Sequence, residues 1–383
     1  MKQPVALFAL LLSVLAANAQ NSASPRPVPQ NQPASNTPSK SRVVVLENPA
    51  LVNNFHVNDS LLAQSFNQAF LAFTKKSTLK EAWQQFVTPQ DVVAIHITTT
   101  GGLALNSHHA LVGAVVDGLK NAGVSDDNIV VWDKFADDMQ AAGYGPNNGN
   151  SFRCVSVIPG AGFDSDKFYF SDVAGQLIWG DHDFRGRTNV DNLLPMDSLD
   201  DLQTKSSGSV AVSGTKNTEP PQVSNRSYYT NVITKRTTKI INLPVMSNDE
   251  RVGLAGCISS LALASIDNTR RFLNSSDAVN EAIAEIYAHD EINKKVVLNI
   301  MDGSIAQYAG GPYFVPYYCA QPGLIYISKD PVAIDTLALE RIEQWRKTKA
   351  VDPVGNDAGH LKQAALQGLG TTDKSQMEIV NLR

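Results

Sequence analysis

The chain is poor in cysteine. Its 383 residues include only Cys154, Cys257 and Cys319, and no C-x-x-C motif is present. This pattern excludes a disulfide framework, a zinc ribbon and an iron-sulfur cluster. One disulfide bridge and three mostly buried thiols remain as alternatives, and the wide spacing of the three residues favours the thiols.

Clusters of positive charge and long apolar runs are also missing. The formal net charge is -5 and there is no Lys/Arg run, which argues against nucleic acid or an anionic membrane as the main partner. The apolar stretch near the N-terminus has about a dozen residues, fewer than the ~20 that a membrane-spanning helix needs. Because the sequence has no G-x-G-x-x-G, G-x-x-x-x-G-K-S/T or G-x-S-x-G motif, we predict neither a nucleotide loop nor a hydrolase elbow.

The first 19 residues have the three parts of a secretory signal peptide. Met1-Lys2 is the positive region, Val5 to Ala16 the apolar region, and Ala17-Asn18-Ala19 a small-x-small cleavage site. We therefore predict an exported protein, periplasmic or extracellular, with no stable membrane insertion after cleavage.

Residues 20–42 have a different composition from the rest of the chain. Proline, serine, asparagine and glutamine dominate there, and large apolar residues are almost absent. Such a segment cannot bury enough apolar surface to offset the entropy of ordering, so we predict a disordered linker. The remainder, 43–383, is long enough for one large domain.

Strand and helix patterns alternate along this remainder. Short β-branched runs, typical of strands covered on both faces, alternate with segments of helical apolar spacing. The predicted strands are 43–46, 91–97, 128–132, 238–245, 295–301, 323–328 and 377–380. The predicted helices are 60–73, 79–86, 107–123, 253–264, 278–288, 331–349 and 361–367. This alternation predicts an α/β protein with a mainly parallel sheet flanked by helices.

The interval 145–225 lacks this alternation. It is rich in glycine, asparagine, aspartate and serine, with isolated aromatic residues. An interval of this length is too long for a plain connection, so we predict an irregular, loop-rich insert beside the ligand site.

Polar residues follow the predicted strands. Ligands of open α/β sheets bind where the carboxyl ends of the strands meet. Thr98, Gly101 and Gly102 follow the second strand and either cradle a ligand or form a simple polar turn. His108 opens the next helix, where the helix dipole favours a neutral imidazole suited to proton transfer or metal binding. A surface histidine is the alternative.

Three carboxylates stand near the predicted strand ends. Asp133 and Asp302, together with His108, form the predicted acid–base set. Asp302 and Asp335 are the predicted ligands of a divalent metal, the cofactor class that oxygen-rich sites accept. Helix capping and surface exposure are the alternatives for Asp302 and Asp335.

Eight ordered blocks give the chain a resemblance to a known family. They include TPQDVVAIHITTTGG, TKIINLPV, IMDGSIAQYAGGP and ISKDPVAIDTLALERI. Together they resemble DUF362, a bacterial domain of unknown function, from Val43 to Val380. The resemblance implies a DUF362-like α/β domain over 43–383 and no settled reaction. It also implies that Asn242 and Gln307 join Thr98, Gly101 and Gly102 in binding a ligand.

The chain departs from the DUF362 pattern at several lysines. His96 stands where relatives have Lys, Ser247-Asn248-Asp249 stands for Lys-Asp-His, and Ser259-Ser260 stands for Lys-Asn. Serine cannot replace a lysine that faces a phosphate or carboxylate. The resemblance therefore implies loss of an anion site, and Ser247→Lys is expected to restore affinity for the anion that relatives bind.

Two functions remain from the sequence. The first is an exported, enzyme-like protein with a polar, metal-assisted cleft that takes a small polar ligand, and the retained Asp and His residues favour it. The second is a non-catalytic module that binds a solute or partner through the same cleft, and the lost lysines favour it.

Overall fold

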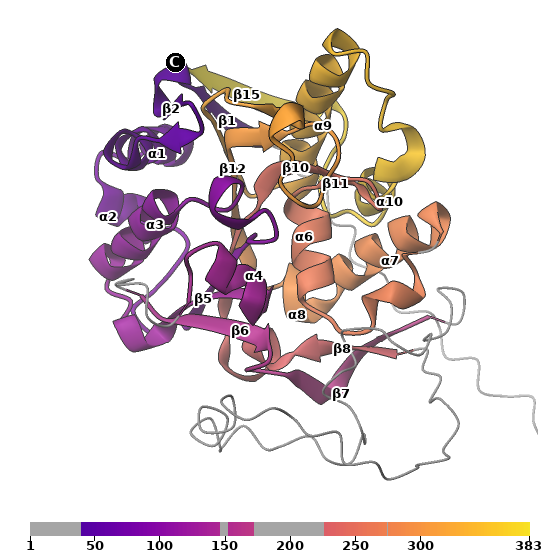
Figure 1. Cartoon of the computed structure of the whole chain (residues 1–383). Helices are drawn as coiled ribbons and strands as arrows, with labels where there is room; N and C mark the ends of the chain where they lie inside the picture. Colours follow the sequence, from indigo (N-terminus) through magenta and orange to yellow (C-terminus); the bar gives the residue numbers. More distant parts are fainter. Residues whose placement is uncertain (1–39, 146–151, 172–225, 274) are drawn as a thin grey trace, which may run out of the picture. The chain divides into compact units, whose positions relative to one another are not determined.

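The structure, a computed structural model, describes residues 40–145, 152–171, 226–273 and 275–383 (Figure 1). The predicted signal peptide and nearly all of the predicted linker lie outside these residues. The described chain is built on one sheet of 11 strands, with the order β15-β1-β14-β12-β9-β4-β5-β6 along its main path. These strands are β1 (Ser41–Glu47), β4 (Val93–Ile97), β5 (Ile129–Phe135), β6 (Cys154–Ile158), β9 (Lys239–Leu243), β12 (Val296–Gln307), β14 (Leu324–Ser328) and β15 (Met377–Leu382).

Most neighbouring strands in this sheet are parallel. β12, β9, β4, β5 and β6 form one parallel block. β14 runs antiparallel to both β12 and β1, and β1 is parallel to β15. The predicted α/β class with a mainly parallel sheet is confirmed.

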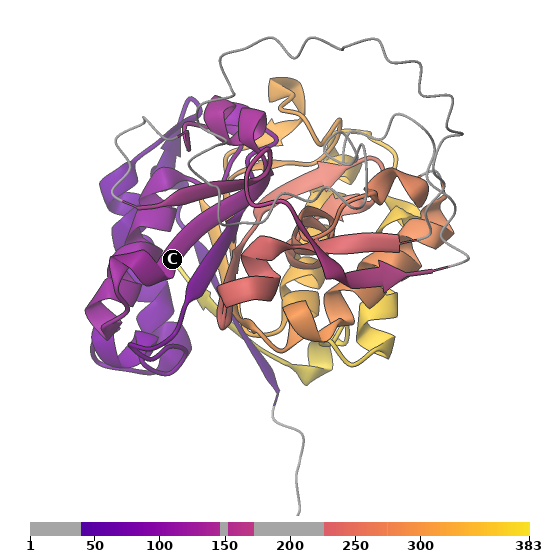
Figure 2. The same ribbon diagram turned by 90° about the horizontal axis from the view of Figure 1, so that it is seen from below.

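Helices cover both faces of the sheet, as seen on opposite sides in Figure 2. Ile95 and Ile97 pack into a core with α1 (Asp59–Thr74), α2 (Leu79–Trp83) and α3 (His109–Ala122). Ala94, the alternate residue of β4, packs into a second core with α6 (Cys257–Ala264), α7 (Ser276–Ala288), α9 (Pro331–Thr348) and α10 (His360–Leu366). Each strand therefore presents alternate residues to two separate cores.

Short elements complete the described chain. They are α4 (Ala136–Ala141), α8 (Asp290–Asn293), β2 (Val52–Asn53), β3 (His56–Val57), β7 (Phe163–Phe170), β8 (Arg226–Thr230), β10 (Val245–Asp249), β11 (Gly253–Ala255) and β13 (Cys319–Ala320). All three cysteines are free thiols. In the described residues, no helix is both long enough and apolar enough to cross a membrane.

Capping residues are present at one end each of α9 and α3. The Asp330 side chain accepts a hydrogen bond from Ala333 N at 2.8 Å, and Pro331 occupies the first turn of α9. Gly123 ends α3 with φ of 106°, a left-handed conformation that favours glycine. These local signals explain why the ends of α3 and α9 were predictable.

The segment after β9 differs from its prediction. We expected one strand over 238–245 and a helix from 253, but β10 and β11 pair antiparallel before α6 begins at Cys257. The polar letters of Ser247 to Asp249 suggest a turn, yet all five residues of β10 are buried. Asn248 Nδ2 donates to Gly253 O at 2.9 Å, so a cross-strand bond satisfies the side chain in a buried hairpin.

Part of the predicted insert is regular structure. β6 adds a parallel strand to the sheet beside β5, and β7 pairs with β8. The alternation of the short run CVSVI fits a strand, although glycine-rich and asparagine-rich flanks conceal it in the sequence. Residues 172–225 of the predicted insert lie outside the described residues.

Two glycines of α3 allow a matched test of packing. A Cβ added at Gly118 would lie 1.9 Å from Trp83 Nε1, whereas a Cβ at Gly113 would meet no atom within 4 Å. Gly118→Ala is expected to lower the free energy of unfolding by about 1–3 kcal/mol through overpacking. Gly113→Ala is expected to raise it by about 0.5–1 kcal/mol, the usual gain in a helix interior. Urea unfolding of both variants checks this, and equal signs for the two would contradict it.

Candidate functional site

The topology locates a ligand site before any side chain is considered. From β4 the chain passes through α3 to β5, whereas from β9 it passes through α6 and α7 to β12 on the other side. β4 and β9 are parallel neighbours, so their connections leave in opposite directions and on opposite faces. In doubly wound sheets, ligands bind at the carboxyl ends of such a strand pair.

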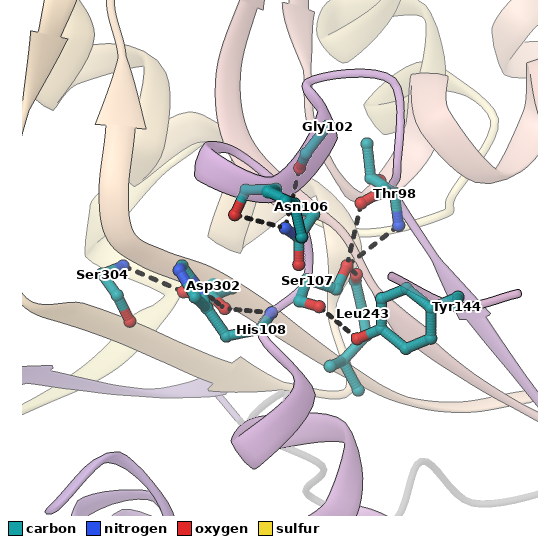
Figure 3. A network of polar contacts seen from close by, with 10 residues as sticks. Thr98, Gly102, Asn106, Ser107, His108, Tyr144, Leu243, Asp302 and Ser304 are labelled. Atoms are coloured by element: carbon teal, nitrogen blue, oxygen red, sulfur yellow. Dashed lines mark hydrogen bonds and ion pairs between the residues drawn. The ribbon is translucent and has the colours of Figure 1, made fainter. Parts of the chain in front are cut away.

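His108 and Asp302 form a buried pair at this edge (Figure 3). Asp302 Oδ2 lies 2.8 Å from His108 Nδ1 and accepts a second hydrogen bond from His108 N at 3.0 Å. Asp302 Oδ1 accepts from Ser304 N at 3.0 Å. The Asp302 side chain is 1% exposed and that of His108 12%. The carboxylate thus caps the first turn of α3 and orients the imidazole at the same time.

The two groups shift each other's pKa. Burial lowers the pKa of His108, but the charge of Asp302 and its hydrogen bond outweigh burial and raise the pKa above the ordinary 6.5. Burial raises the pKa of Asp302, but His108 and the N–H groups of His108 and Ser304 bring it below the ordinary 3.8. Between about pH 3.8 and 6.5, this arrangement favours an imidazolium–carboxylate pair.

The pair also has a defined pH window. A raised histidine pKa stabilises the fold fully below pH 6.5 and ceases to do so as the pH rises through the folded value. A lowered aspartate pKa stabilises the fold above pH 3.8 and ceases to do so as the pH falls through the folded value. Both contributions are therefore present between about pH 3.8 and 6.5.

Ser107, next to His108, joins three chain segments. Its Oγ accepts from Thr98 N at 2.9 Å and donates to Leu243 O at 2.5 Å, which connects the ends of β4 and β9. The Tyr144 hydroxyl donates to Ser107 O. These bonds fix the start of α3 against the sheet, and Figure 3 shows them converging beside the His108–Asp302 pair.

Asp133 lies at the end of β5 and is bound to the same loop. It accepts from Thr99 N at 2.9 Å and Thr99 Oγ1 at 2.5 Å, and from Lys134 N at 2.6 Å. Burial raises the pKa of Asp133 to about 6 despite these bonds. Asp133 and Asp302 are therefore both hydrogen-bonded to the segment from Thr98 to His108, which includes the third predicted acid–base residue.

Asn242 does not join them. It lies one residue before Leu243 on β9, on the face covered by α6, where it donates to Cys257 O at 2.7 Å. Asp302 lies on the opposite face, which α3 covers. It follows Leu298 and Ile300 of that core at two-residue spacing, and residues at this spacing in a strand share one face. The sheet separates the two side chains.

The remaining predicted ligand residues shape the backbone. A Cβ at Gly101 would lie 2.2 Å from Leu105 O, and Gly102 has φ of 65°, so both positions of this turn favour glycine. Gln307 donates to Tyr313 O at 2.9 Å and accepts from Val315 N at 2.7 Å, which holds the loop after β12. Thr98 Oγ1 is buried without a hydrogen-bond partner.

Asp335 lies at a different helix from Asp302. It accepts from Cys257 N at 2.6 Å and Ile258 N at 3.0 Å, so it caps α6. The described residues contain no group of three or more His, Cys, Asp or Glu side chains that could hold a metal ion. Since Asp302 and Asp335 each cap a separate helix, the residues present do not fit a metal ion bound by both.

Comparison with known proteins finds a match to one protein family. Residues 198–340 match the model of DUF362, described as a domain of unknown function. The match covers less than half of the 383 residues. No curated protein matches the chain. A crystal structure of a Thermotoga maritima protein, a structural genomics target, matches with a TM-score of 0.37 and 9% identity. The match covers 78% of this chain and 60% of that protein, and it is too weak to bear on fold or function.

The matched segment, residues 198–340, holds only part of the site. Asp302 lies within it, whereas Thr98, His108 and Asp133 precede it. The serines that replace the expected lysines are bonded locally. Ser247 Oγ donates to Asn248 O at 3.0 Å, and Ser259 Oγ donates to Leu254 O at 2.6 Å.

Sequence reasoning missed three contributors to this edge. Tyr144 follows a short helix and lies 36 positions after His108, so only tertiary structure brings its hydroxyl to Ser107. Thr99 is one of three consecutive threonines. If the alternation of side chains along β4 is continued past its end, Thr99 falls on the same face as Ile95 and Ile97, and this pattern was the only indication in the sequence of its contact with Asp133. Ser107 was noted only as part of the motif that opens α3.

Asp302→Asn tests the electrostatics of the pair. Without the carboxylate charge, burial remains and lowers the pKa of His108. The His108 midpoint is therefore expected to move from above 6.5 in the parent chain to below 6.5 in the variant. Side-chain NMR titration checks this, with His108→Gln to assign the resonance. An unchanged midpoint would show that Asp302 does not control the imidazole.

Proposed function

We propose that this chain is an exported DUF362-type protein in which His108 transfers protons to and from a small polar ligand, with Asp302 as its orienting partner. The observation that carries the proposal is the 2.8 Å contact between Asp302 Oδ2, within β12, and His108 Nδ1, at the start of α3. A carboxylate on Nδ1 holds the imidazole in one orientation and directs Nε2 away from itself, as in acid–base catalysis.

Three further features support this proposal. In the described residues, His108 Nε2 has no hydrogen-bond partner, so its acid–base capacity is not already used. Asn106 is 2% exposed and Ser304 0%. Asn106 Oδ1 and Ser304 Oγ are buried without partners, and both side chains appear near the pair in Figure 3. Unsatisfied polar atoms around an available imidazole are typical of a site that holds water or ligand.

A ligand screen tests the proposal. Thermal shift of the intact mature chain is measured against neutral polar metabolites and against Ca, Mg, Mn and Zn ions. A ligand of this site is expected to raise Tm by several degrees in the parent chain, to lose that effect in His108→Gln, and to keep it in His56→Gln, an exposed control position. A screen without any shift, or a shift indifferent to His108, would overturn the proposal.

The alternative is a non-catalytic binding module. The favouring observation is that Asp302 and Asp335 occupy the N-termini of α3 and α6, positions that would otherwise attract an anion. Under this alternative, ligands still shift Tm in His108→Gln, and inorganic phosphate produces no shift. The His108 variant therefore separates the two functions.

Export is tested separately. The proposal rests on the signal peptide pattern of residues 1–19. Fractionation of expressing cells and N-terminal sequencing are expected to find a mature chain that begins at Gln20 outside the cytoplasm. A cytoplasmic chain that retains Met1 would contradict it.

A further inference from the structure

A row of polar side chains crosses the sheet on the face covered by α6. Register places Asn299 of β12 beside Asn242 of β9, Asn242 beside His96 of β4, and His96 beside Trp132 of β5. All four are at most 1% exposed. The row lies on the opposite face from the His108–Asp302 pair and does not depend on it.

Hydrogen bonding fixes the tautomer of His96. Asn299 Nδ2 donates to Lys329 O at 3.2 Å, which leaves Asn299 Oδ1 to accept from Asn242 Nδ2 at 3.0 Å. Asn242 Nδ2 also donates to Cys257 O, so Asn242 Oδ1 is the atom that faces His96 Nδ1 at 2.8 Å. His96 Nδ1 must therefore carry the proton and donate it.

The other nitrogen of His96 is consequently a bare acceptor. Burial lowers the pKa of His96 to about 4, and the bond to Asn242 offsets this only in part, so the ring is neutral at pH 7. A neutral ring that is protonated at Nδ1 has a lone pair at Nε2. No hydrogen bond reaches Nε2 from any described residue.

The ring that packs against His96 carries an unpartnered donor. The two nitrogens of an imidazole point in different directions, so Nε2 points away from Asn242, which Nδ1 contacts on β9. The rings of His96 and Trp132, the latter on β5, pack with centroids 5.0 Å apart. Trp132 Nε1 is buried without a partner, and so is Thr98 Oγ1, which alternation along β4 places on the same face as His96.

We propose that His96 and Trp132, with Thr98 at the edge, bind adjacent hydroxyl groups of a small neutral polyol. One hydroxyl can donate its proton to His96 Nε2 and accept from Trp132 Nε1–H. A second hydroxyl can meet Thr98 Oγ1. A carboxylate or phosphate oxygen is disfavoured, because it has no proton to offer and its lone pairs face that of Nε2.

The chemistry distinguishes this site from a merely buried histidine. His360 is also fully buried, with neither ring nitrogen bonded, but the ring contact with the unpartnered indole of Trp132 belongs to His96. At His96 the acceptor is His96 Nε2, the donor is Trp132 Nε1–H on the neighbouring strand, and Thr98 Oγ1 follows β4. A ligand hydroxyl group, which both donates and accepts a hydrogen bond, requires such a pair of acceptor and donor.

The test uses glycerol as the neutral probe and acetate, which has a carboxylate and no hydroxyl group, as the anionic probe. Both are titrated into the full chain while NMR follows the Nε2 nitrogen of His96 and the indole proton of Trp132, with His360 as the internal control. Glycerol is expected to shift both resonances saturably and leave His360 unchanged. Acetate is expected to shift neither resonance at the same concentrations.

Two variants make the test specific. Trp132→Phe removes the N–H, and Thr98→Val removes the hydroxyl at nearly equal volume. We expect at least a tenfold weaker apparent affinity for glycerol in Trp132→Phe and a smaller loss in Thr98→Val. If Trp132→Phe does not fold, Thr98→Val alone decides. The proposal is overturned by a non-saturable response, by equal binding of acetate, or by unchanged affinity in the variants.

Discussion

Replacing Asp302 with alanine is expected to lower the free energy of unfolding by about 3–5 kcal/mol at pH 6, the usual cost of removing one member of a buried ion pair. The carboxylate accepts hydrogen bonds from His108 N, His108 Nδ1 and Ser304 N. The side chain is 1% exposed, so water cannot easily replace these bonds. The variant would leave an unpaired imidazole, one unpaired backbone donor at the start of α3 (His108 N) and another in β12 (Ser304 N).

Urea unfolding at several pH values checks this result. The loss is expected to be largest between about pH 3.8 and 6.5, where both members of the pair contribute. Asp373 is the matched control, because it caps a turn through Ser375 N but is exposed. Asp373→Ala is expected to have a far smaller effect. A loss below about 1 kcal/mol for Asp302→Ala, the size of a surface pair, would show that the contact is not a buried ion pair.

Asp335 gives the second large effect, and its sign depends on pH. Burial raises the pKa of Asp335 to about 7, although Cys257 N and Ile258 N donate to it. A raised carboxyl pKa favours the folded state below pH 3.8, and this contribution is lost as the pH rises toward 7. With ~1.4 kcal/mol per pKa unit, the change is on the order of 4 kcal/mol.

Asp335→Asn isolates this contribution. Asparagine resembles the protonated carboxyl and does not ionise, so the variant is expected to gain stability relative to the parent chain as the pH rises from 4 to 8. Its amide nitrogen still opposes one of the two N–H groups, and the variant is therefore expected to be the less stable protein at pH 4. Chemical unfolding of both chains at pH 4, 6 and 8 gives the difference, and parallel pH profiles would show that Asp335 remains ionised.

The pairing of His108 with Asp302 was within reach of the sequence. His108 lies at the start of α3, and Asp302 directly follows the predicted strand 295–301, although β12 continues to Gln307. Predicted boundaries at the carboxyl edge of a parallel sheet converge. The face of the sheet on which each polar side chain lies was harder to predict. Asn242 lies at the predicted edge, but a strand turns successive side chains to opposite faces, so one position separates it from the Asp302 side.

Buried polar residues were also difficult to predict from the sequence. His96 sits between two isoleucines and is indistinguishable by pattern from a core position until Asn242 and Trp132 are placed beside it. Ser247 to Asp249 look like a solvent-exposed turn in the sequence, yet they are buried in β10, and Asn248 Oδ1 accepts from the distant Gly311 N at 3.3 Å. The sequence shows which residues are polar, but only the tertiary structure shows which polar groups have hydrogen-bond partners.

The position of β1 has a consequence for how this protein is made. β1 lies between β14 and β15, and both neighbours come from beyond residue 323. During synthesis the first strand therefore has no sheet partner until the last segments leave the ribosome. Because these contacts span nearly the whole domain, the sheet is completed late and slowly. A chain that stops short of β15 would leave β1 as an open edge, available for pairing with another molecule.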